Sequence, residues 1–329
     1  MSFKINKLLV ITSGGDAPGM NAVIRAVVRT AIYEGIEIYG CRMGYQGIVE
    51  QEPFLLDSHF VSNCIQRGGT ILQSARYEKF KEKTTRDQAR AKLAQYNIDA
   101  MVVLGGDGSF RGATLLEREG GPRVIGVPCT IDNDIAGTEY TIGFNTARNT
   151  AVNAIDKIRD TAFSHNRNFL VEVMGRASGF LAVDVGIAGG AEFILIPEIP
   201  LSIDDLAARI AMNKAHNTKL GSIIVVAEAD NPGHSFAIAE QLQQRLHEEY
   251  KVCVLGHTQR GGTPSVEDRK IGSLMGARAV HALQQGQTQK MLVIKQGQLL
   301  LADFPDPTAV ARQFSDMELL KINKILCNV

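Results

Sequence analysis

One local pattern recurs along the chain: a short apolar run, a loop rich in glycine or charge, and then a helical pattern. The first copy is "LLVIT", the loop "SGGDAPGMN" and a segment from Met20 whose apolar residues fall on one helical face. Six more runs lead into similar loops: "AMVVL", "VIGV", "FLVEVM", "FILI", "SIIVVA" and "VCVL". Continuously apolar strands that alternate with helices indicate parallel sheets buried on both faces. The pattern predicts an α/β fold with two doubly wound, mostly parallel sheets.

The division into domains follows less directly from the pattern. One sheet is expected to take the strands up to Val127, and the other those from Phe169 to Ala227. No Ser/Gly linker, charge run or low-complexity segment separates them. The point at which the chain returns to the first sheet therefore stays open at this stage.

Charge and cysteine content exclude several classes of protein. The 329 residues carry 35 Lys plus Arg and 35 Asp plus Glu, so no net field favours nucleic acid or an anionic membrane. The five cysteines are scattered and never spaced as CxxC, which argues against a disulfide framework and a zinc site. No run reaches the roughly 18 apolar residues of a membrane span, and the first apolar run is too short for a signal peptide. We expect a soluble protein of the reducing cytoplasm.

Two glycine-rich loops follow strands of the first predicted sheet. Gly14 and Gly15 precede a helix, which suits either phosphate binding or a tight turn, and the loop alone does not separate these readings. "GGDGS" holds Asp107 among glycines, where a carboxylate would repel phosphate unless a divalent cation lay between them. Mg²⁺ binds through one or two carboxylates plus substrate phosphates. A nucleotide–magnesium site is therefore favoured, although the GxxxxGK[ST] of P-loop ATPases is absent.

A third loop, "TIDND", follows the strand at 124–127 and carries Thr130, Asp132 and Asp134. Ligands of open parallel sheets lie beyond the carboxyl ends of the strands, so this loop shares an edge with Asp107. A carboxylate there can accept the proton of a hydroxyl group that attacks phosphorus. The alternative is an Asx-turn in which the aspartates only cap local backbone. Three loops with acidic side chains at one edge of the sheet favour a catalytic role for these aspartates over a purely local turn.

Cationic side chains in other glycine-rich loops complete the requirements of phosphoryl transfer. Arginine suits bidentate contact with phosphate oxygens. The candidates are Arg76, Arg176, His257 and Arg260. By contrast, the basic stretches Lys79 to Lys83 and Arg86 to Lys92 are typical of a solvated helix face.

A dinucleotide-binding oxidoreductase is an alternative from another class. Gly106, Gly108 and Gly112 spell GxGxxxG, and Asp132 follows about 20 residues later, close to the dinucleotide fingerprint. Asp107 inside the loop counts against it, because a bare pyrophosphate would meet a negative charge. A catalytically silent phosphate-binding subunit is a third possibility.

Taken together, the loops resemble those of bacterial-type ATP-dependent 6-phosphofructokinases over nearly the whole chain. The matching segments are "ITSGGDAPGMNAVIRAVVR", "RGGTILQSAR", "GGDGS", "TIDNDIAGTEYTIGFNTA", "VEVMGR", "GGAEF" and "LGHTQRGG". The resemblance implies two Rossmann-like domains, a larger ATP-binding one at 1–142 plus 257–308 and a smaller sugar-phosphate-binding one at 143–256 plus 309–329. It further implies transfer of the γ-phosphoryl group of MgATP to the 1-hydroxyl of fructose 6-phosphate by a cytoplasmic homotetramer.

The same resemblance assigns roles to individual residues. Asp132 would accept the proton beside Thr130 and Asp134, and Arg76 and Arg176 would stabilise the transferring group. The ATP set would be Gly15, Arg76, Tyr77, Gly106, Asp107, Gly108 and Ser109, with Asp107 holding Mg²⁺. The substrate set would be Thr130, Ile131, Asp132, Arg167, Met174, Gly175, Arg176, Glu228, Lys251, His257 and Arg260, with Arg167 and Lys251 reaching across a subunit interface. A pocket for ADP or phosphoenolpyruvate would use Arg25, Arg29, Arg159, Gly190, Glu192 and Lys219.

Several positions depart from the family pattern. Lys251 stands where arginine is usual, and Cys129 where ATP-using members have glycine. Pyrophosphate-using relatives carry lysine at the latter position and aspartate at the position of Gly108, so ATP is the favoured donor. Ser58 replaces an arginine and Asn63 an aspartate of the effector pocket, and "AHNTKLGS" keeps little more than Lys219 of a basic cluster. We expect weak or altered regulation, because fewer cations bind phosphoenolpyruvate less well.

Overall fold

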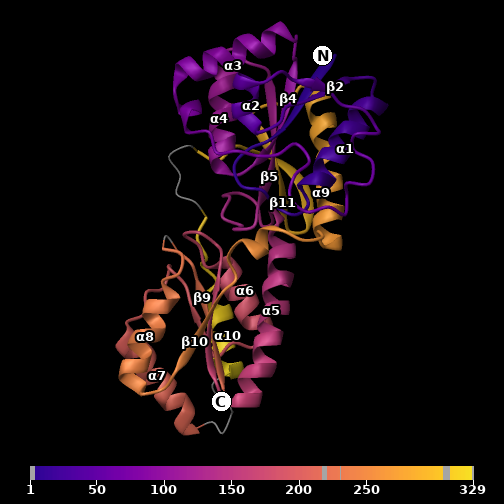
Figure 1. Cartoon of the computed structure of the whole chain (residues 1–329). Coiled ribbons are helices and arrows are strands. Elements are labelled where there is room, and N and C mark those ends of the chain that lie inside the picture. The colour runs from indigo at the N-terminus through magenta and orange to yellow at the C-terminus, as the bar shows by residue number, and fades with distance from the viewer. Residues whose placement is uncertain (1–3, 217–220, 230, 307–311, 328–329) are drawn as a thin grey trace. The chain divides into compact units, whose positions relative to one another are not determined.

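The computed structural model describes residues 4–216, 221–229, 231–306 and 312–327, which form two compact units (Figure 1). The first unit comprises Met1–Thr130, Ile135–Thr146 and Arg260–Ala311, and the second Ile131–Asp134, Ala147–Gln259 and Arg312–Val329. Each unit has its own sheet with helices on both faces. The predicted α/β class with mostly parallel sheets is confirmed.

The sheet of the first unit has the order β12-β11-β5-β4-β1-β2-β3, with β6 paired to β5. Its strands are β1 (Lys7–Thr12), β2 (Glu37–Gly40), β3 (Phe54–Leu55), β4 (Ala100–Gly105), β5 (Arg123–Thr130), β6 (Ile142–Gly143), β11 (Lys290–Lys295) and β12 (Gln298–Asp303). Pairing is parallel except for β2 with β3 and β11 with β12. The central strands β1, β4 and β5 end side by side, so the loops that follow them emerge at one edge.

Six helical segments surround this sheet: α1 (Met20–Tyr33), α2 (Gly44–Glu50), η1 (Glu78–Lys81), α3 (Lys83–Gln95), α4 (Asp107–Arg118) and α9 (Val266–Gln284). Figure 1 shows α1 and α9 together on one face and α2, α3 and α4 on the other. A Cβ on Gly276 of α9 would lie 2.6 Å from the carbonyl oxygen of Val23, so glycine allows α9 to pack closely on α1. On the opposite face, Leu9, Met101 and Leu116 belong to one buried core.

The second unit is built on a four-stranded parallel sheet of order β10-β7-β9-β8. Its strands are β7 (Asn168–Val173), β8 (Phe193–Leu195), β9 (Ser222–Ala227) and β10 (Tyr250–Val254). Its helices are α6 (Phe180–Ala188), α7 (Ile203–His216), α8 (Ser235–Leu246), α10 (Met317–Cys327) and most of α5 (Phe144–His165), and η2 (Gly256–Arg260) follows β10. Leu170, Leu206, Ile224 and Leu242 form its core beneath α7 and α8.

One prediction about the surface is wrong. The basic stretch that begins at Arg86 was expected to be solvated, yet Arg86 is only 6% exposed. Its Nε and Nη2 donate to the Glu119 carboxylate at 2.9 and 2.7 Å, and its Nη1 donates to the carbonyl of Phe80 at 3.0 Å. The partner lies 33 residues away, so no local pattern signals this buried pair.

All five cysteines are free thiols, and Cys41, Cys64 and Cys129 are buried. Among the described helices none is both long and apolar enough to cross a membrane.

Candidate functional site

In the first unit, the loops that follow β1 and β4 are joined by direct hydrogen bonds. The N–H of Ser13 donates to the carbonyl of Leu104 at 2.9 Å, and Ser109 Oγ donates to the carbonyl of Ser13 at 3.0 Å. The structure thus places the loop of Gly14 and Gly15 against the loop at 105–109. Both loops come from adjacent parallel strands, which explains how segments about ninety residues apart meet.

The glycines of the second loop have different surroundings. A Cβ on Gly105 would lie 2.5 Å from both Ser109 Oγ and the Ser13 carbonyl oxygen, so this glycine is required by packing. A Cβ on Gly106 or Gly108 would meet no heavy atom within 4 Å, and neither residue needs a positive φ. These two glycines flank Asp107 at the N-terminus of α4, a helix of 12 residues. Open backbone at a helix N-terminus allows close approach of a phosphate group.

This contrast predicts opposite outcomes for two alanine substitutions. Gly105→Ala is expected to lower the free energy of unfolding by about 2 kcal/mol or more, because the new methyl group overlaps backbone and Ser109. Gly108→Ala is expected to fold like the parent and to weaken nucleotide binding instead, since its methyl group occupies the path to the backbone. Urea unfolding and nucleotide titration of both variants check this, and a Gly108→Ala variant with unchanged nucleotide affinity would contradict it.

Asp107 fits the predicted magnesium site. It is the first residue of α4, is partly exposed, and stands between the two open glycines. Across the described part of the chain, no group of three or more His, Cys, Asp or Glu side chains forms a metal cage. A single carboxylate is the protein contribution expected when Mg²⁺ binds mainly through substrate phosphates. When bound, the ion would neutralise phosphate charge at this loop.

The segment that carries Arg76 is fixed to the first glycine loop. The N–H of Gly14 donates to the carbonyl of Ala75 at 3.1 Å, and Ser74 Oγ donates to the carbonyl of Gly14 at 2.8 Å. Arg76 itself is exposed, with half-buried Tyr77 beside it. The structure therefore brings Gly15, Arg76 and the loop at 105–109 together within the first unit.

Asn21 is a positioning residue that sequence reasoning missed. It is fully buried in the first turn of α1; its Nδ2 donates to the carbonyl of Arg67 at 2.9 Å, and its Oδ1 accepts from the N–H of Ile71 at 2.8 Å. These bonds hold the segment "RGGTI" that leads to Arg76. The available signal was a polar amide among apolar neighbours at the start of a helix.

Arg260 belongs to the first unit, whereas most of the predicted sugar-phosphate set belongs to the second. A Cβ on Gly15 would lie 2.7 Å from Arg260 Nη1, which donates to the carbonyl of Asp16 at 3.2 Å. The guanidinium group therefore covers Gly15 in this structure. Thr130 also belongs to the first unit, where its carbonyl accepts from Thr141 Oγ1 at 2.7 Å.

In the second unit, the two aspartates of "TIDND" are almost completely buried. Asp132 is 7% and Asp134 is 9% exposed, and Ile131 is fully buried. Buried Ser178 points its Oγ at two carbonyl oxygens, that of Asp132 at 3.2 Å and that of Gly175 at 2.9 Å. A single hydroxyl group thus connects the aspartate loop with the "MGR" loop.

The ends of β7, β9 and β10 bring further predicted substrate residues together. The N–H of Glu228 donates to the carbonyl of Val173 at 2.8 Å, and the N–H of exposed Arg176 donates to Glu228 Oε1 at 3.4 Å. Met174 is 7% exposed and Gly175 has a φ of +139°, which favours glycine. His257 is exposed in η2, just after β10.

Arg167 and Lys251 do not join this group. Arg167 directly precedes β7, and Lys251 pairs in register with Phe169 near the start of that strand. A strand of this length spans about 20 Å, so both side chains belong to the opposite end of the sheet from Met174 and Glu228. Lys251 is half-exposed and forms an ion pair with Glu249.

The described residues of the predicted effector set are divided between the two units. Arg25 and Arg29 lie on α1 of the first unit, and Lys219 lies outside the described residues. In the second unit, Arg159 Nη2 donates to the carbonyls of Gly189 at 2.7 Å and Gly190 at 2.6 Å, and its Nη1 lies 3.5 Å from Glu192 Oε1. Ser58 and Asn63 are exposed in the first unit.

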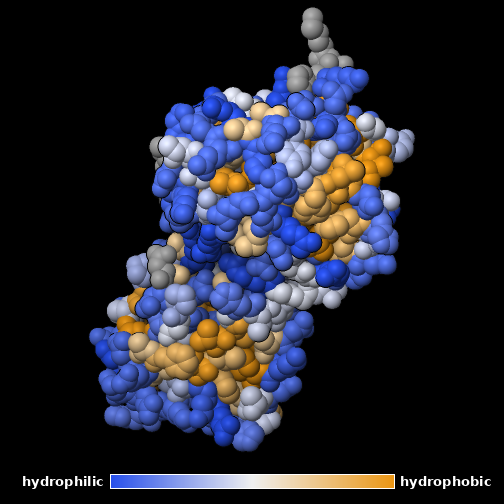
Figure 2. Space-filling model, turned by 45° about the horizontal axis from the view of Figure 1, so that its top comes forward, coloured by the Kyte–Doolittle hydropathy of each residue, from blue (hydrophilic) through white to orange (hydrophobic). Residues whose placement is uncertain are grey.

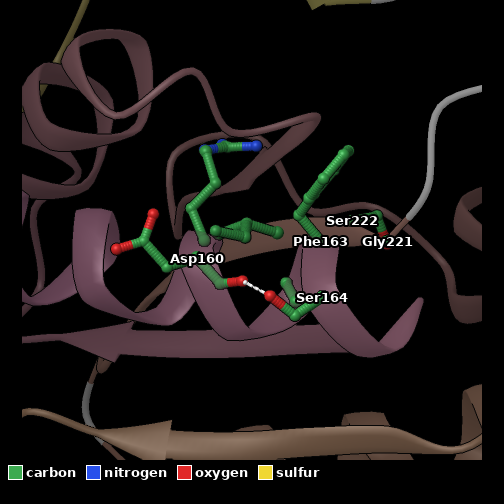
Figure 3. A pocket seen from close by; sticks show the side chains of 8 residues that line it. Asp160, Phe163, Ser164, Gly221 and Ser222 are labelled. Carbon is green, nitrogen blue, oxygen red and sulfur yellow. Dashed lines mark hydrogen bonds between the residues drawn. The ribbon is translucent and has the colours of Figure 1, made fainter.

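A surface pocket of ≈ 520 Å³ adjoins Arg159 (Figure 3). Its lining residues come from α5 and the start of β9: Arg159, Asp160, Ala162, Phe163, Ser164, Gly221, Ser222 and Ile223. Figure 3 shows the hydrogen bond of 2.8 Å from Ser164 Oγ to the Asp160 carbonyl. The pocket lies at the amino end of β9, whereas Glu228 follows the carboxyl end, so it is separate from Met174 and Glu228. It adjoins Arg167, whose carbonyl accepts from the N–H of the pocket residue Ser222 at 3.3 Å.

Cys129, which stands where the resemblance leads us to expect glycine, is 1% exposed near the end of β5. Burial, followed by the nearby Asp268 carboxylate, raises the pKa of its thiol well above the usual value. The side chain is therefore a neutral thiol and brings no charge to the site.

Comparison with known proteins agrees with these observations. The family model described as phosphofructokinase matches residues 7–283. An ATP-dependent 6-phosphofructokinase of Coxiella burnetii is 59% identical over 324 residues, which cover 98% of this chain and 99% of that protein. An ATP-dependent 6-phosphofructokinase 1 of Thermus thermophilus is 48% identical over 323 residues, covering 98% and 99%.

Solved structures show the same fold. The T-state crystal structure of Pichia pastoris phosphofructokinase has a TM-score of 0.85 and 35% identity, and the match covers 92% of this chain and 35% of that longer chain. A pyrophosphate-dependent phosphofructokinase of Marinobacter aquaeolei has a TM-score of 0.82 at 24% identity, covering 94% and 86%, which bears on the fold alone. The family model and these relatives show that the chain belongs to the phosphofructokinase family.

Proposed function

We propose that the protein transfers the γ-phosphoryl group of ATP to the 1-hydroxyl of fructose 6-phosphate, giving fructose 1,6-bisphosphate and ADP in glycolysis. The observation that carries this proposal is the connection, through Ser178, of buried Asp132 to the loop of Met174, Gly175 and Arg176. The bond ends on the Asp132 carbonyl, so it fixes the backbone of this aspartate against the loop proposed to bind the sugar phosphate. Relatives that match along nearly their full length are named ATP-dependent 6-phosphofructokinase.

In the proposed mechanism, Asp132 accepts the proton of the 1-hydroxyl as its oxygen attacks the γ-phosphorus. The transition state spreads negative charge over the phosphoryl oxygens, so positioned cations stabilise it. Arg76 and Arg176 are the proposed cations, and both are exposed as a substrate-binding arginine must be. Asp107 would hold Mg²⁺, which neutralises charge on the donor phosphates. Asp134 supports the loop, its carbonyl accepting from the N–H of Arg312 at 2.7 Å.

A coupled assay with fructose 6-phosphate and Mg²⁺ tests the donor, comparing ATP with pyrophosphate. ATP is expected to be used, because the surroundings of Gly108 are open and the buried Cys129 thiol adds no cation. Turnover with pyrophosphate alone would replace the proposal by the pyrophosphate-dependent alternative. Tight NAD(P) binding without Mg²⁺ would instead support an oxidoreductase, and no turnover with either donor would support a silent subunit.

Lys251→Arg is expected to lower KM for fructose 6-phosphate. Arginine offers a planar fork to a phosphate, whereas the lysine ammonium acts as a point charge. Arginine at position 251 can form the same ion pair with Glu249 as the lysine does, so the substitution does not remove this contact. Steady-state kinetics at saturating ATP check the prediction, and an unchanged or raised KM would show that position 251 does not contact the sugar phosphate.

Regulation by phosphoenolpyruvate and ADP is proposed to be weak. Ser58 and Asn63 lack the charges of the family pocket, and the guanidinium of Arg159 is already bonded to two carbonyls of its own chain. Titrating each effector into the assay at subsaturating fructose 6-phosphate should leave the curves nearly hyperbolic. Strong sigmoidal inhibition at low phosphoenolpyruvate would contradict this.

A cytoplasmic homotetramer is the proposed assembly. Arg167 and Lys251 lie at the end of the second sheet away from Glu228, which suits residues that contribute to a neighbouring subunit's site. Figure 2 shows apolar side chains gathered on the surface, and exposed large apolar residues include Tyr33 of α1 and Leu326 of α10. Exposed apolar patches mark surfaces of association.

A further inference from the structure

The second unit contains a buried carboxylate that the proposed mechanism does not use. Glu172 is the fifth residue of β7, only 1% exposed, and lies two residues before Met174. A buried carboxylate is strongly destabilising unless its oxygens accept hydrogen bonds. Its partners therefore indicate why a mostly apolar parallel strand carries a charge at this position.

Among the residues that the structure describes, the hydrogen bonds to this carboxylate come from the chain segment that follows β9. Oε1 accepts from the N–H of Gly233 at 2.6 Å. Oε2 accepts from the N–H of Ser235 at 3.1 Å and from its Oγ at 2.5 Å. Ser235 is the first residue of α8 and is fully buried, so the helix N-terminus is held on β7 by a charge of favourable sign.

The segment held in this way begins at Glu228. Glu228 leaves the end of β9, and Gly233 follows five residues later, so the Glu172 side chain closes the far end of the loop that carries Glu228. The near end is fixed by the bond from the N–H of Glu228 to the carbonyl of Val173. The Glu172 carbonyl also accepts from the N–H of Leu255 at 3.0 Å, two residues before His257.

We propose that Glu172 is a positioning residue for the sugar-phosphate site, fixing the loop of Glu228 and the start of α8 against the strand that leads to Met174, Gly175 and Arg176. This inference rests on the proposed function of that site. Glu172 itself contacts no substrate. It acts through the placement of Glu228, whose carboxylate lies near the N–H of Arg176.

Glu172→Gln tests this role with little change in volume. Each carboxylate oxygen faces a peptide N–H, so a glutamine amide must turn its NH₂ group toward one of these donors. KM for fructose 6-phosphate is expected to rise at least about tenfold through misplacement of the loop, while KM for ATP changes by no more than about twofold. Amide hydrogen exchange at Gly233 or Ser235 is expected to quicken in the same variant.

Asn323→Ala is the matched control. Asn323 is a buried polar residue of α10 in the same unit, and its Nδ2 donates to the carbonyl of Ala191 at 3.1 Å. The variant should be less stable than the parent without raising KM for fructose 6-phosphate. If Glu172→Gln raises this KM no more than Asn323→Ala does, Glu172 has only a structural role and the inference is overturned.

Ser235→Ala gives a milder second test, which decides the matter if Glu172→Gln does not fold. It removes one of the three donors and should raise KM for fructose 6-phosphate about two- to fivefold. An unchanged KM in that variant would overturn the inference. Failure of the proposed function is a distinct result, since the parent enzyme would then show no turnover of fructose 6-phosphate.

Discussion

Asp132→Asn is expected to reduce kcat for fructose 6-phosphate phosphorylation by at least about 10²-fold, with a smaller change in KM. Asparagine keeps the shape of the side chain and the backbone bond from Ser178, because that bond ends on the Asp132 carbonyl. What it removes is the ability to accept a proton from the attacking hydroxyl. Loss of kcat without a comparable loss of binding is the signature of a group that acts in the transition state.

Steady-state kinetics with ATP and fructose 6-phosphate measure this effect. Asp156→Asn, the same chemical change on the exposed face of α5, serves as the control and should leave kcat unchanged. A second comparison is Asp134→Asn, which should lower kcat less than Asp132→Asn because Asp134 is proposed to support the loop. Near-parental kcat in Asp132→Asn would show that another group accepts the proton.

Seven strands of the two sheets could be predicted because each is a mostly apolar run before a polar loop. β1, β4, β5, β7, β8, β9 and β10 all follow this pattern, and the first helix begins at Met20 as expected. β2, β6, β11 and the edge strands β3 and β12 were not predicted. β2 and β3 are short, and β12 alternates between exposed and partly buried residues, so none of them forms an apolar run.

The candidate site was predictable to the extent that its residues follow strands. Asp107, Asp132 and Gly175 could be assigned to sheet edges from the sequence alone, since parallel strands carry their loops at the same end. Glu172, Asn21 and Asp268 were missed, because their roles depend on partners that lie 46 or more residues away. A lone polar letter inside an apolar segment marks such a residue, but the partner appears only in three dimensions.

Asp268→Asn is expected to lower the free energy of unfolding by about 3 kcal/mol or more, a large effect for an isosteric change. Asp268 is fully buried in the first turn of α9. Oδ1 accepts from the N–H of Gly143 at 2.7 Å and from the hydroxyl of Tyr140 at 2.9 Å. Oδ2 accepts from the N–H of Thr146 at 2.8 Å and from the hydroxyls of Thr146 and Ser265.

Because every one of these groups is able to donate, an asparagine NH₂ group would face a peptide N–H whichever way the amide turned. Glu267→Gln is the matched control: it is the preceding residue, changes the same charge, and loses only a surface pair with Lys270, worth at most about 1 kcal/mol. Urea unfolding of the two variants distinguishes the loss of buried hydrogen bonds from the loss of a negative charge in the first turn of α9. Equal stability losses would mean that helix charge, rather than the buried bonds to the segment 140–146, accounts for the effect. A much larger loss of stability in Asp268→Asn would show that this carboxylate fixes the segment 140–146, which follows the aspartate loop along the chain. The stability of the first unit would then depend on the segment that leads away from Asp132.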